Sequence, residues 1–248
     1  MPHTAHILHG RYAVVSCHVE RPLDDVVWRR FAALQQRRPG RFPIAALMRP
    51  PGLGEDESAW LERAREAQAR GPFGLHTHWT APDHARPTGG DPAALVREQV
   101  HWLRSAGLEA ELFCGGGWYL DEPVAEALAE LGYTDCTATA FRPDYLAPDA
   151  AHLQLDEPAW LELTSGRRLL ELPTTHSIGM LVRGVFAADH RQVLHAYFHD
   201  TDLLDRRRAA ALRAGLTLLG LRRTPSDLRE LQRGLRPEKT MSFAKSRG

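Results

Sequence analysis

The sequence predicts an α/β fold in which short parallel strands alternate with longer helices, arranged as one barrel or barrel-like sheet. Three observations support this prediction. Apolar runs of strand length alternate with segments whose apolar residues recur at helical spacing. Several strand-like runs end in histidine or a carboxylate, which is where sites form in such folds. The chain has 248 residues, 43% of them hydrophobic, which is enough for the core of one barrel domain.

The first half of the chain alternates the two patterns regularly. Phe31 and Leu34 belong to an apolar stripe at helical spacing, whereas the runs before and after this stripe are continuously apolar. Proline and glycine at residues 50–52 end the second apolar run. The expected elements are, in order, strand 12–19, helix 24–36, strand 42–48, helix 57–70 and strand 74–79.

The second half begins with a polar loop over residues 83–90 and continues the alternation. Asp91 and Pro92 supply an N-cap and a first-turn proline for the next helix, and Gly107 ends it. The expected elements are helix 91–106, strand 111–114, helix 122–131, strand 134–140, an irregular or hairpin-like stretch 142–168, strand 168–172, loop 173–179, strand 193–198, helix 203–221 and helix 226–232.

Nothing in the sequence marks a domain boundary. There is no internal repeat and no break in composition, so residues 1–248 are expected to form a single domain. Its core would span about 12–232, and the polar tail from Arg236 onward is expected to fray.

Composition narrows the possible partners and the location. The formal net charge is +0, so nothing global indicates nucleic acid or an anionic membrane as a partner. No apolar stretch approaches the ~20 residues of a membrane span, and the N-terminus lacks the pattern of a secretory signal. We therefore expect a cytoplasmic protein whose three cysteines are reduced and buried. The sequence gives no indication of oligomeric state.

Side chains of the type that bind metals gather at the ends of three predicted strands. His18 and Glu20 end the first strand, His76 and His78 end another, and His199 ends a third. Residues two apart on a strand point to the same face, so each of the first two pairs presents both side chains together. Parallel strands would bring all of them to one rim of a barrel, where a single pocket is expected.

The order of motifs resembles the polysaccharide deacetylases, which are metal-dependent carbohydrate esterases. Residues 16–20 stand in place of the first motif, a strand ending in acidic residues, and residues 74–77 match the opening of the second. Residues 113–119 stand where the family has an arginine-proline-glycine motif. Residues 131–135 resemble the lead into the fifth strand, and residues 198–200 resemble the last motif. The resemblance covers roughly 12–232 and implies a single distorted (β/α)7 barrel with deacetylase activity.

The sequence departs from the family pattern at three points. The family's first two motif-one aspartates are replaced by His18 and Val19, with Glu20 beside them. The second metal histidine of the family falls where this chain has Thr80, while His78 lies closer to His76. The arginine of the third motif is absent.

The expected metal set is therefore a rearranged one, formed by Glu20, His76 and His78. Two imidazoles and a carboxylate suit zinc above all, with nickel, cobalt or iron as alternatives, and leave positions open for water and substrate. The alternative for the two histidines is a structural role, with both rings hydrogen-bonded by neighbouring loops.

His18, His199 and Asp135 are the candidate catalytic residues. His18 is a candidate general base, with a third metal ligand or a pocket wall as alternatives. The resemblance makes His199 the candidate general acid, and a structural barrel histidine is the alternative. Asp135 would orient a ligand or a substrate hydroxyl, or would only end its strand.

Substrate contacts are expected from residues that follow strand ends. Aromatic side chains there can stack on a sugar ring or simply pack on the barrel rim, and a glycine turn can expose backbone N–H groups or only shape the turn. The candidates are Trp79, Gly116, Trp118, Tyr119 and His176.

These residues support two hypotheses about function. The first is a metal-dependent hydrolase that removes an acyl group from an N-acetylated sugar or cleaves a related C–N bond in a small molecule. The second is a catalytically degenerate barrel of the same type that binds carbohydrate or a partner protein without turnover.

Overall fold

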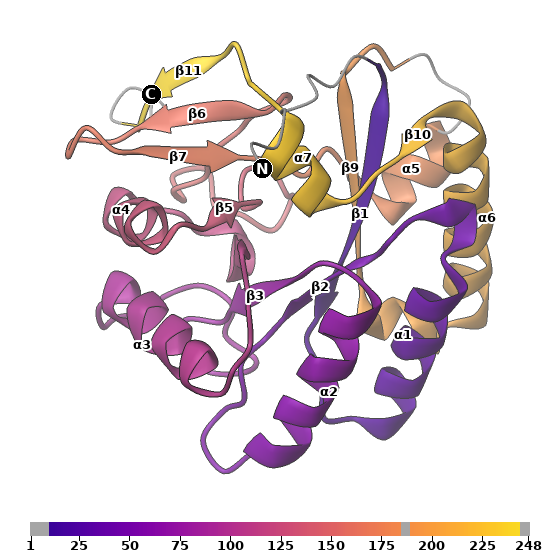
Figure 1. Cartoon of the computed structure of the whole chain (residues 1–248), viewed down its shortest axis with the longest axis horizontal. Helices are drawn as coiled ribbons and strands as arrows, with labels where there is room; N and C mark the ends of the chain where they lie inside the picture. Colours follow the sequence, from indigo (N-terminus) through magenta and orange to yellow (C-terminus); the bar gives the residue numbers. More distant parts are fainter. Residues whose placement is uncertain (1–9, 185–188, 244–248) are drawn as a thin grey trace, which may run out of the picture.

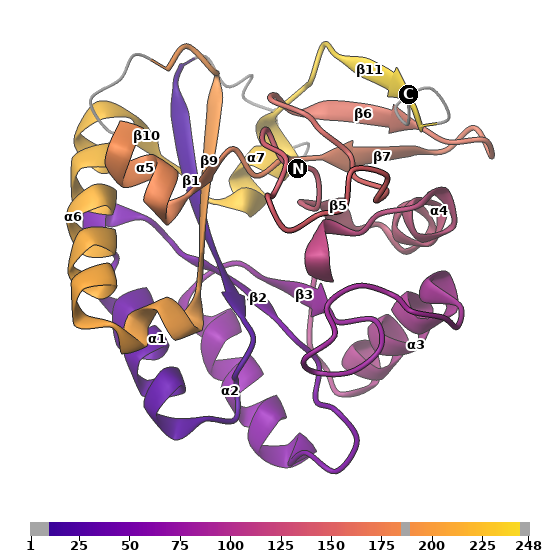
Figure 2. The same ribbon diagram turned by 180° about the vertical axis from the view of Figure 1, so that it is seen from behind.

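Parallel strands form the centre of the molecule, and helices cover them from outside (Figures 1 and 2). The computed structural model describes residues 10–184 and 189–243. The strands are β1 (Tyr12–Val19), β2 (Ala45–Met48), β3 (Phe73–Thr77), β4 (Leu112–Gly115), β5 (Thr134–Asp135), β6 (Ala159–Glu162), β7 (Arg168–Glu171), β8 (His176–Ser177), β9 (Val193–His199), β10 (Thr224–Pro225) and β11 (Thr240–Ser242).

The helices begin at the caps that the sequence offers. Asp24, Asp56, Asp91 and Asp121 each accept a hydrogen bond from a backbone N–H of the first turn of the helix that follows. The helices are α1 (Asp25–Arg37), α2 (Glu57–Arg70), α3 (Pro92–Ser105), α4 (Glu122–Leu131), α5 (Ile178–Gly184), α6 (Arg206–Arg222) and α7 (Leu228–Gly234), with short 3-10 turns at η1 (Pro39–Arg41), η2 (Gly116–Trp118) and η3 (Asp200–Leu204).

One segment, residues 168–177, closes the sheet into a ring. β1, β2, β3, β4 and β5 pair in parallel in that order, and β9 pairs with the other edge of β1. Residues 168–177 then join the two ends. Their first part pairs with β5 through Asp135 and Glu171, and their last part pairs with β9 through His176 and Ala196. This ring of strands confirms the predicted distorted α/β barrel.

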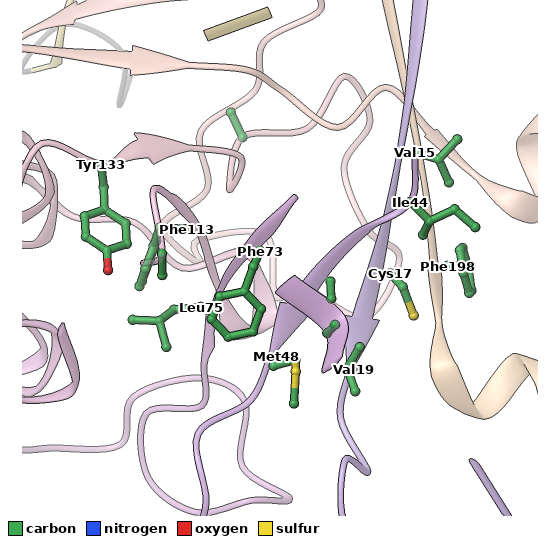
Figure 3. Packing of buried hydrophobic residues seen from close by; sticks show 14 of the residues in the cluster. Val15, Cys17, Val19, Ile44, Met48, Phe73, Leu75, Phe113, Tyr133 and Phe198 are labelled. Atoms are coloured by element: carbon green, nitrogen blue, oxygen red, sulfur yellow. The ribbon is translucent and has the colours of Figure 1, made fainter. Parts of the chain in front are cut away.

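Alternation along each strand separates two apolar layers. On β1, Val15, Cys17 and Val19 belong to the large cluster between strands and helices, whereas Val14 belongs to a smaller cluster inside the barrel. Figure 3 shows residues of the first cluster, including Phe198 of β9 and Leu75 of β3. The residues between them on these strands therefore face the barrel interior.

The structure corrects three predicted segments. The strand expected over 134–140 is regular only at Thr134–Asp135, because the chain beyond it pairs with residues 154 and 174 in isolated bridges. The loop expected over 173–179 contains β8 and the start of α5. The tail expected to fray carries β11, which pairs in parallel with β6. Local sequence misses these segments because they are short and depend on partners far along the chain.

A search of the described residues found no helix long and apolar enough to cross a membrane. Whether the whole chain forms a single domain stays a prediction.

Candidate metal and active site

The ends of β1, β3 and β9 deliver five polar side chains to one place. His18 pairs with His199 in the register of β1 and β9, and Glu20 follows directly after β1. His76 lies in β3 and His78 follows it. Since the side chains of alternate residues share a face, these residues all point into the barrel mouth at the carboxyl ends of the strands. The structure thus brings the predicted set together.

A single carboxylate oxygen lies at the centre of this group. Glu20 Oε1 is 3.6 Å from His76 Nε2, 3.7 Å from His78 Nε2 and 3.5 Å from His199 Nε2. Burial acts to raise the pKa of Glu20, but its contacts with His76 and His78 outweigh that effect and hold the pKa well below its usual range. Glu20 is therefore a carboxylate at neutral pH.

Backbone carbonyls fix the orientation of two of the rings. His76 Nδ1 lies 3.1 Å from the carbonyl oxygen of Cys114, and His78 Nδ1 lies 2.7 Å from that of Pro82. A carbonyl only accepts, so each Nδ1 carries a proton, and in the neutral form of either ring the lone pair is on Nε2. Burial lowers the pKa of His76, which favours the neutral ring. Histidine ligands of metals are commonly held in this way, by a hydrogen bond from the second ring nitrogen.

Glu20, His76 and His78 fit a divalent cation. One ligand atom from each lies within 4.8 Å of the others. With bonds of about 2.1 Å, two ligands of a tetrahedral zinc ion lie about 3.4 Å apart, close to the measured separations from Glu20. Among the described residues, His78 Nε2 is buried and has no hydrogen-bond partner. A buried lone pair without a partner is costly unless something binds it, and a cation would.

A second group of possible ligands fits a metal less well. His18, His76 and Cys114 also offer atoms within 4.8 Å of one another, and all three residues are buried. Burial raises the pKa of the Cys114 thiol well above its usual value, so the sulfur keeps its proton. Metals bind the thiolate, and the set with Glu20 is therefore the better candidate.

His18 lies under the candidate metal set. Its ring stacks on His76, with centroids 4.3 Å apart, and its Nε2 is 3.6 Å from the sulfur of Cys114. Trp118 and Tyr197 pack against the same ring. Burial lowers the pKa of His18 well below its usual value, with a further contribution from His76, so this imidazole is neutral.

A cavity of about 400 Å³ opens above these residues. His18, His76, Glu20 and His199 line one side of it. The rest of the lining comes from the loop after β3, the end of β4 and the turn after it, the loop that follows β5, and β9. These residues are Asp83, His84, Ala85, Arg86, Thr88, Gly115, Gly117, Trp118, Tyr145 and Tyr197. The lining thus combines imidazole, charged and aromatic side chains.

Arg86 is a cavity residue that sequence reasoning missed. Its guanidinium donates hydrogen bonds to the carbonyl oxygens of Gly117, at 2.6 Å, and Ala151, at 2.9 Å. It thereby ties three loops together at the cavity wall. Tyr145 and Tyr197 also line the cavity, and sequence reasoning missed them as well. The loops that carry Arg86 and Tyr145 have no periodic pattern, so nothing local in the sequence indicated their position.

Trp118 lines the cavity as predicted, in an unusual backbone conformation. Its φ is +56°, a left-handed value that costs a non-glycine residue about 1 kcal/mol or more. Its ring centroid lies 4.9 Å from that of Tyr197 and 5.2 Å from that of His18. Packing of the indole therefore holds the strained turn. Such strain is concentrated at functional sites.

Several predicted substrate contacts lie elsewhere. Trp79 is only 7% exposed, and its indole donates to the carbonyl of Gly116, so both residues serve packing of the turn. The Tyr119 hydroxyl donates to Asp121, outside the residues that line the cavity. His176 lies 3.8 Å from the carboxylate of Asp189 and does not line the cavity either. These side chains follow strand ends, but they point away from the barrel mouth.

Asp135 is also away from the cavity. It is fully buried inside the barrel, where its Oδ1 accepts hydrogen bonds from the backbone of Cys136 and Thr137 and from the Thr137 hydroxyl. Thr137 in turn accepts the backbone N–H of Gly115 at 2.7 Å. Asp135 therefore supports the turn after β4 from below and does not contact a ligand in the cavity.

Comparison with known proteins identifies the fold. Neither a protein-family model nor a curated protein matches the sequence. Among solved structures, a candidate polysaccharide deacetylase from Mycobacterium smegmatis superposes with a TM-score of 0.61 at 15% identity, over 86% of this chain and 85% of that one. The chain has the fold of the polysaccharide deacetylases.

Two further structures show the range of proteins with this fold. A deacetylase designated T48, solved with substrate, matches with a TM-score of 0.53 at 12% identity over 94% of this chain and 96% of its own. A CE4 family pseudoenzyme from Bacillus anthracis matches with a TM-score of 0.55 at 10% identity over 94% of this chain and 70% of its own. The polysaccharide deacetylase fold therefore carries both active and inactive sites. Whether this chain is active must be argued from the residues of its own site.

Proposed function

We propose that this protein is a metal-dependent hydrolase that removes the acyl group from an N-acylated sugar or cleaves a related C–N bond. The observation that carries the proposal is the position of His76 and His78. Both Nε2 atoms lie within 3.7 Å of one oxygen of Glu20, while both Nδ1 atoms donate hydrogen bonds to backbone carbonyls. Solved structures of this fold that are named as deacetylases support the choice of reaction.

Zinc is the proposed ion, with nickel, cobalt and iron as alternatives that the same ligands accept. When bound, it would supply a Lewis acid for the acyl carbonyl and lower the pKa of a water molecule. Glu20, His76 and His78 would hold it, and three protein ligands would leave room for water and substrate.

His18 and His199 are the proposed proton carriers. His18 is a neutral imidazole that lines the cavity, so it can accept a proton from water. The His199 side chain is 37% exposed, more than the buried side chains of His18, His76 and His78, so it can reach the leaving amine and donate a proton to it. The two rings meet edge to face at 5.4 Å, on one side of the cavity.

The aromatic residues of the cavity lining favour an amino sugar as the amine product of the reaction. Trp118, Tyr145 and Tyr197 line a cavity of about 400 Å³, a size that accepts a small ligand. We propose a short soluble saccharide or a sugar precursor as substrate, in a protein of the cytoplasm.

A non-catalytic role is the alternative, and one observation favours it. The arginine of the third family motif is absent, and Arg86, which lines the same cavity, is engaged by two backbone carbonyls. The similarity to a pseudoenzyme of this fold is consistent with such a loss. The barrel would then bind a carbohydrate or a partner protein without turnover.

Metal content and acetate release test the proposal. Purified protein equilibrated with zinc and then dialysed should retain about one equivalent, measured by mass spectrometry of the metal. Glu20→Gln, His76→Ala and His78→Ala should retain almost none, because each removes a ligand. His101→Ala, an exposed histidine on α3, should behave as the unaltered protein.

The same preparations should be assayed for acetate release from N-acetylated sugars. Activity should follow the zinc content across the variants. If the unaltered protein binds no transition metal, the hydrolase proposal fails. If it binds zinc but releases acetate from no sugar tested, the non-catalytic role becomes the better explanation.

A further inference from the structure

A second cavity lies on the other side of His199. It encloses about 450 Å³ between α5, β9 and α6. Both views of the ribbon show α5 beside α6 on the outside of β9 (Figures 1 and 2). Its lining is largely apolar, with Ile178 and Val182 from α5, Phe198 from β9 and Ala211 from α6.

The two cavities share a wall. Tyr197 and His199 line both of them. On the first side His199 Nε2 lies 3.5 Å from Glu20, and on the second side Nδ1 lies 4.0 Å from a carboxylate oxygen of Asp202. Asp202 lines the second cavity. A single imidazole therefore separates the candidate metal site from an apolar hollow.

The charges at the second cavity do not make it an anion site. Arg208 lines it, but its guanidinium is 2.9 Å from the carboxylate of Asp202 and is neutralised there. Arg183 remains as one cation against an apolar surface. The chemistry of the hollow suits an uncharged hydrocarbon group.

We propose that this second cavity binds the acyl chain of the substrate, and that the protein acts on N-acyl sugars with chains longer than acetyl. The inference rests on the proposed function. Its geometric basis is that His199 stands beside both the candidate metal site and the hollow. The acyl chain begins at the carbon under attack, so it reaches past His199 in fewer bonds than any substituent of the sugar ring.

The reaction itself is unchanged by chain length. Water cleaves the amide C–N bond, the acyl carbon takes the hydroxyl group to give a carboxylate, and the nitrogen takes a proton and leaves as the amino sugar. Longer chains add binding energy only. Each methylene buried in an apolar site raises affinity about fourfold. The expected result is a rise in kcat/KM of about two- to fourfold per methylene from acetyl to octanoyl.

The experiment compares N-acetyl-, N-butanoyl-, N-hexanoyl- and N-octanoyl-glucosamine. Ala211→Met should place a larger side chain in the cavity and narrow it, and the ratio of kcat/KM for octanoyl over acetyl should fall toward one. Ala210→Met is the matched control, since it places the same side chain on the exposed face of the same helix. The control should keep the ratio of the unaltered protein.

Binding separates this inference from the proposed function. The affinity of zinc-free protein for N-octanoyl-glucosamine, measured by calorimetry, should exceed that for the acetyl compound, and only Ala211→Met should abolish the difference. This result would support the cavity assignment even if no compound were hydrolysed, in which case the proposed function alone would fail. Equal rates and equal affinities for all chain lengths would overturn the inference. So would a preference for octyl N-acetylglucosaminide, because the octyl group would then be on the sugar.

Discussion

Asp135 and Glu171 form a buried acid pair at the level of single residues. They are partners in the register of β5 and β7, both are fully buried, and their side chains interact. Burial raises the pKa of both carboxyls, and the charge of Asp135 raises that of Glu171 further. Two carboxylates so close in an apolar interior share a proton, which Glu171 keeps.

This proton makes stability depend on pH. The folded protein keeps the Glu171 proton above the pH at which the unfolded chain loses it, so the free energy of unfolding falls as the pH rises from about 4.5 toward the raised pKa. Glu171→Gln should remove this dependence. The variant should gain stability relative to the unaltered protein by up to about 1.4 kcal/mol per pH unit within this window.

Urea denaturation at pH 5, 7 and 9 measures the difference. Glu162→Gln, which changes an exposed glutamate on β6, is the control and should leave the pH profile unaltered. Parallel profiles for Glu171→Gln and the unaltered protein would show that the pair does not hold an extra proton.

At the same scale, strand periodicity explains why the metal set was predictable. Glu20 lies two residues after His18, and His78 lies two residues after His76, each pair at the end of a strand. Because side chains alternate along a strand, the members of each pair share a face. Arg86 and Tyr145 could not be found in this way. Both lie in loops, and the position of Arg86 depends on hydrogen bonds from its guanidinium to distant carbonyls, such as that of Ala151.

At the level of elements, α6 packs against η1 through glycine. A Cβ on Gly220 would lie 2.3 Å from the carbonyl oxygen of Gly40, and one on Gly40 would lie 2.1 Å from that of Leu216. Gly40 also has φ +66°, which disfavours a side chain. The two backbones therefore touch with no room for a methyl group.

Two glycine substitutions in this one helix should have opposite effects. Gly220→Ala should lower the free energy of unfolding by about 2 kcal/mol, because backbone must move to admit the methyl group. Gly215→Ala should raise it by about 0.5–1 kcal/mol, because alanine favours a helix and its Cβ would meet only side chains, at 3.4 Å or more. Urea denaturation of both variants checks the pair. Equal effects would mean that helix propensity alone governs these positions.

Short elements were the ones that the sequence did not predict. α5 spans Ile178–Gly184 and β8 only His176–Ser177, both within or just after an expected loop. α5 contacts α6 and β9, which lie later in the chain. A helix of this length has little stability of its own, so tertiary packing must select it.

At the level of the whole molecule, the C-terminal segment belongs to the fold. β11 extends the sheet beyond β6, and Phe243 after it is 2% exposed within the main apolar cluster. Phe243→Ala should therefore lower the free energy of unfolding by about 3 kcal/mol, the loss expected for a buried aromatic ring. A frayed tail would tolerate the change without loss.

Thermal and urea denaturation of Phe243→Ala measure this effect. Thr240→Ala is the control, because it changes an exposed side chain of β11 and should alter stability by no more than about 0.5 kcal/mol. Equal stability of the two variants would show that this C-terminal segment does not contribute to the stability of the fold.

The sequence by itself determined the class of the fold, the order of its main strands and helices, and the metal-type residues at the strand ends. These are local properties: periodicity of two on strands, helical stripes, and aspartate caps such as Asp91. They also sufficed for the resemblance to polysaccharide deacetylases, which the structure confirms at the level of fold.

Only the tertiary structure decided which side chains share the site. It placed three Nε2 atoms around Glu20, sent Trp79 into the core and His176 to Asp189, and set a second cavity behind His199. Each of these depends on loops and on elements far apart in the sequence. Their positions are fixed by packing and by long-range hydrogen bonds, which no local pattern of residues encodes.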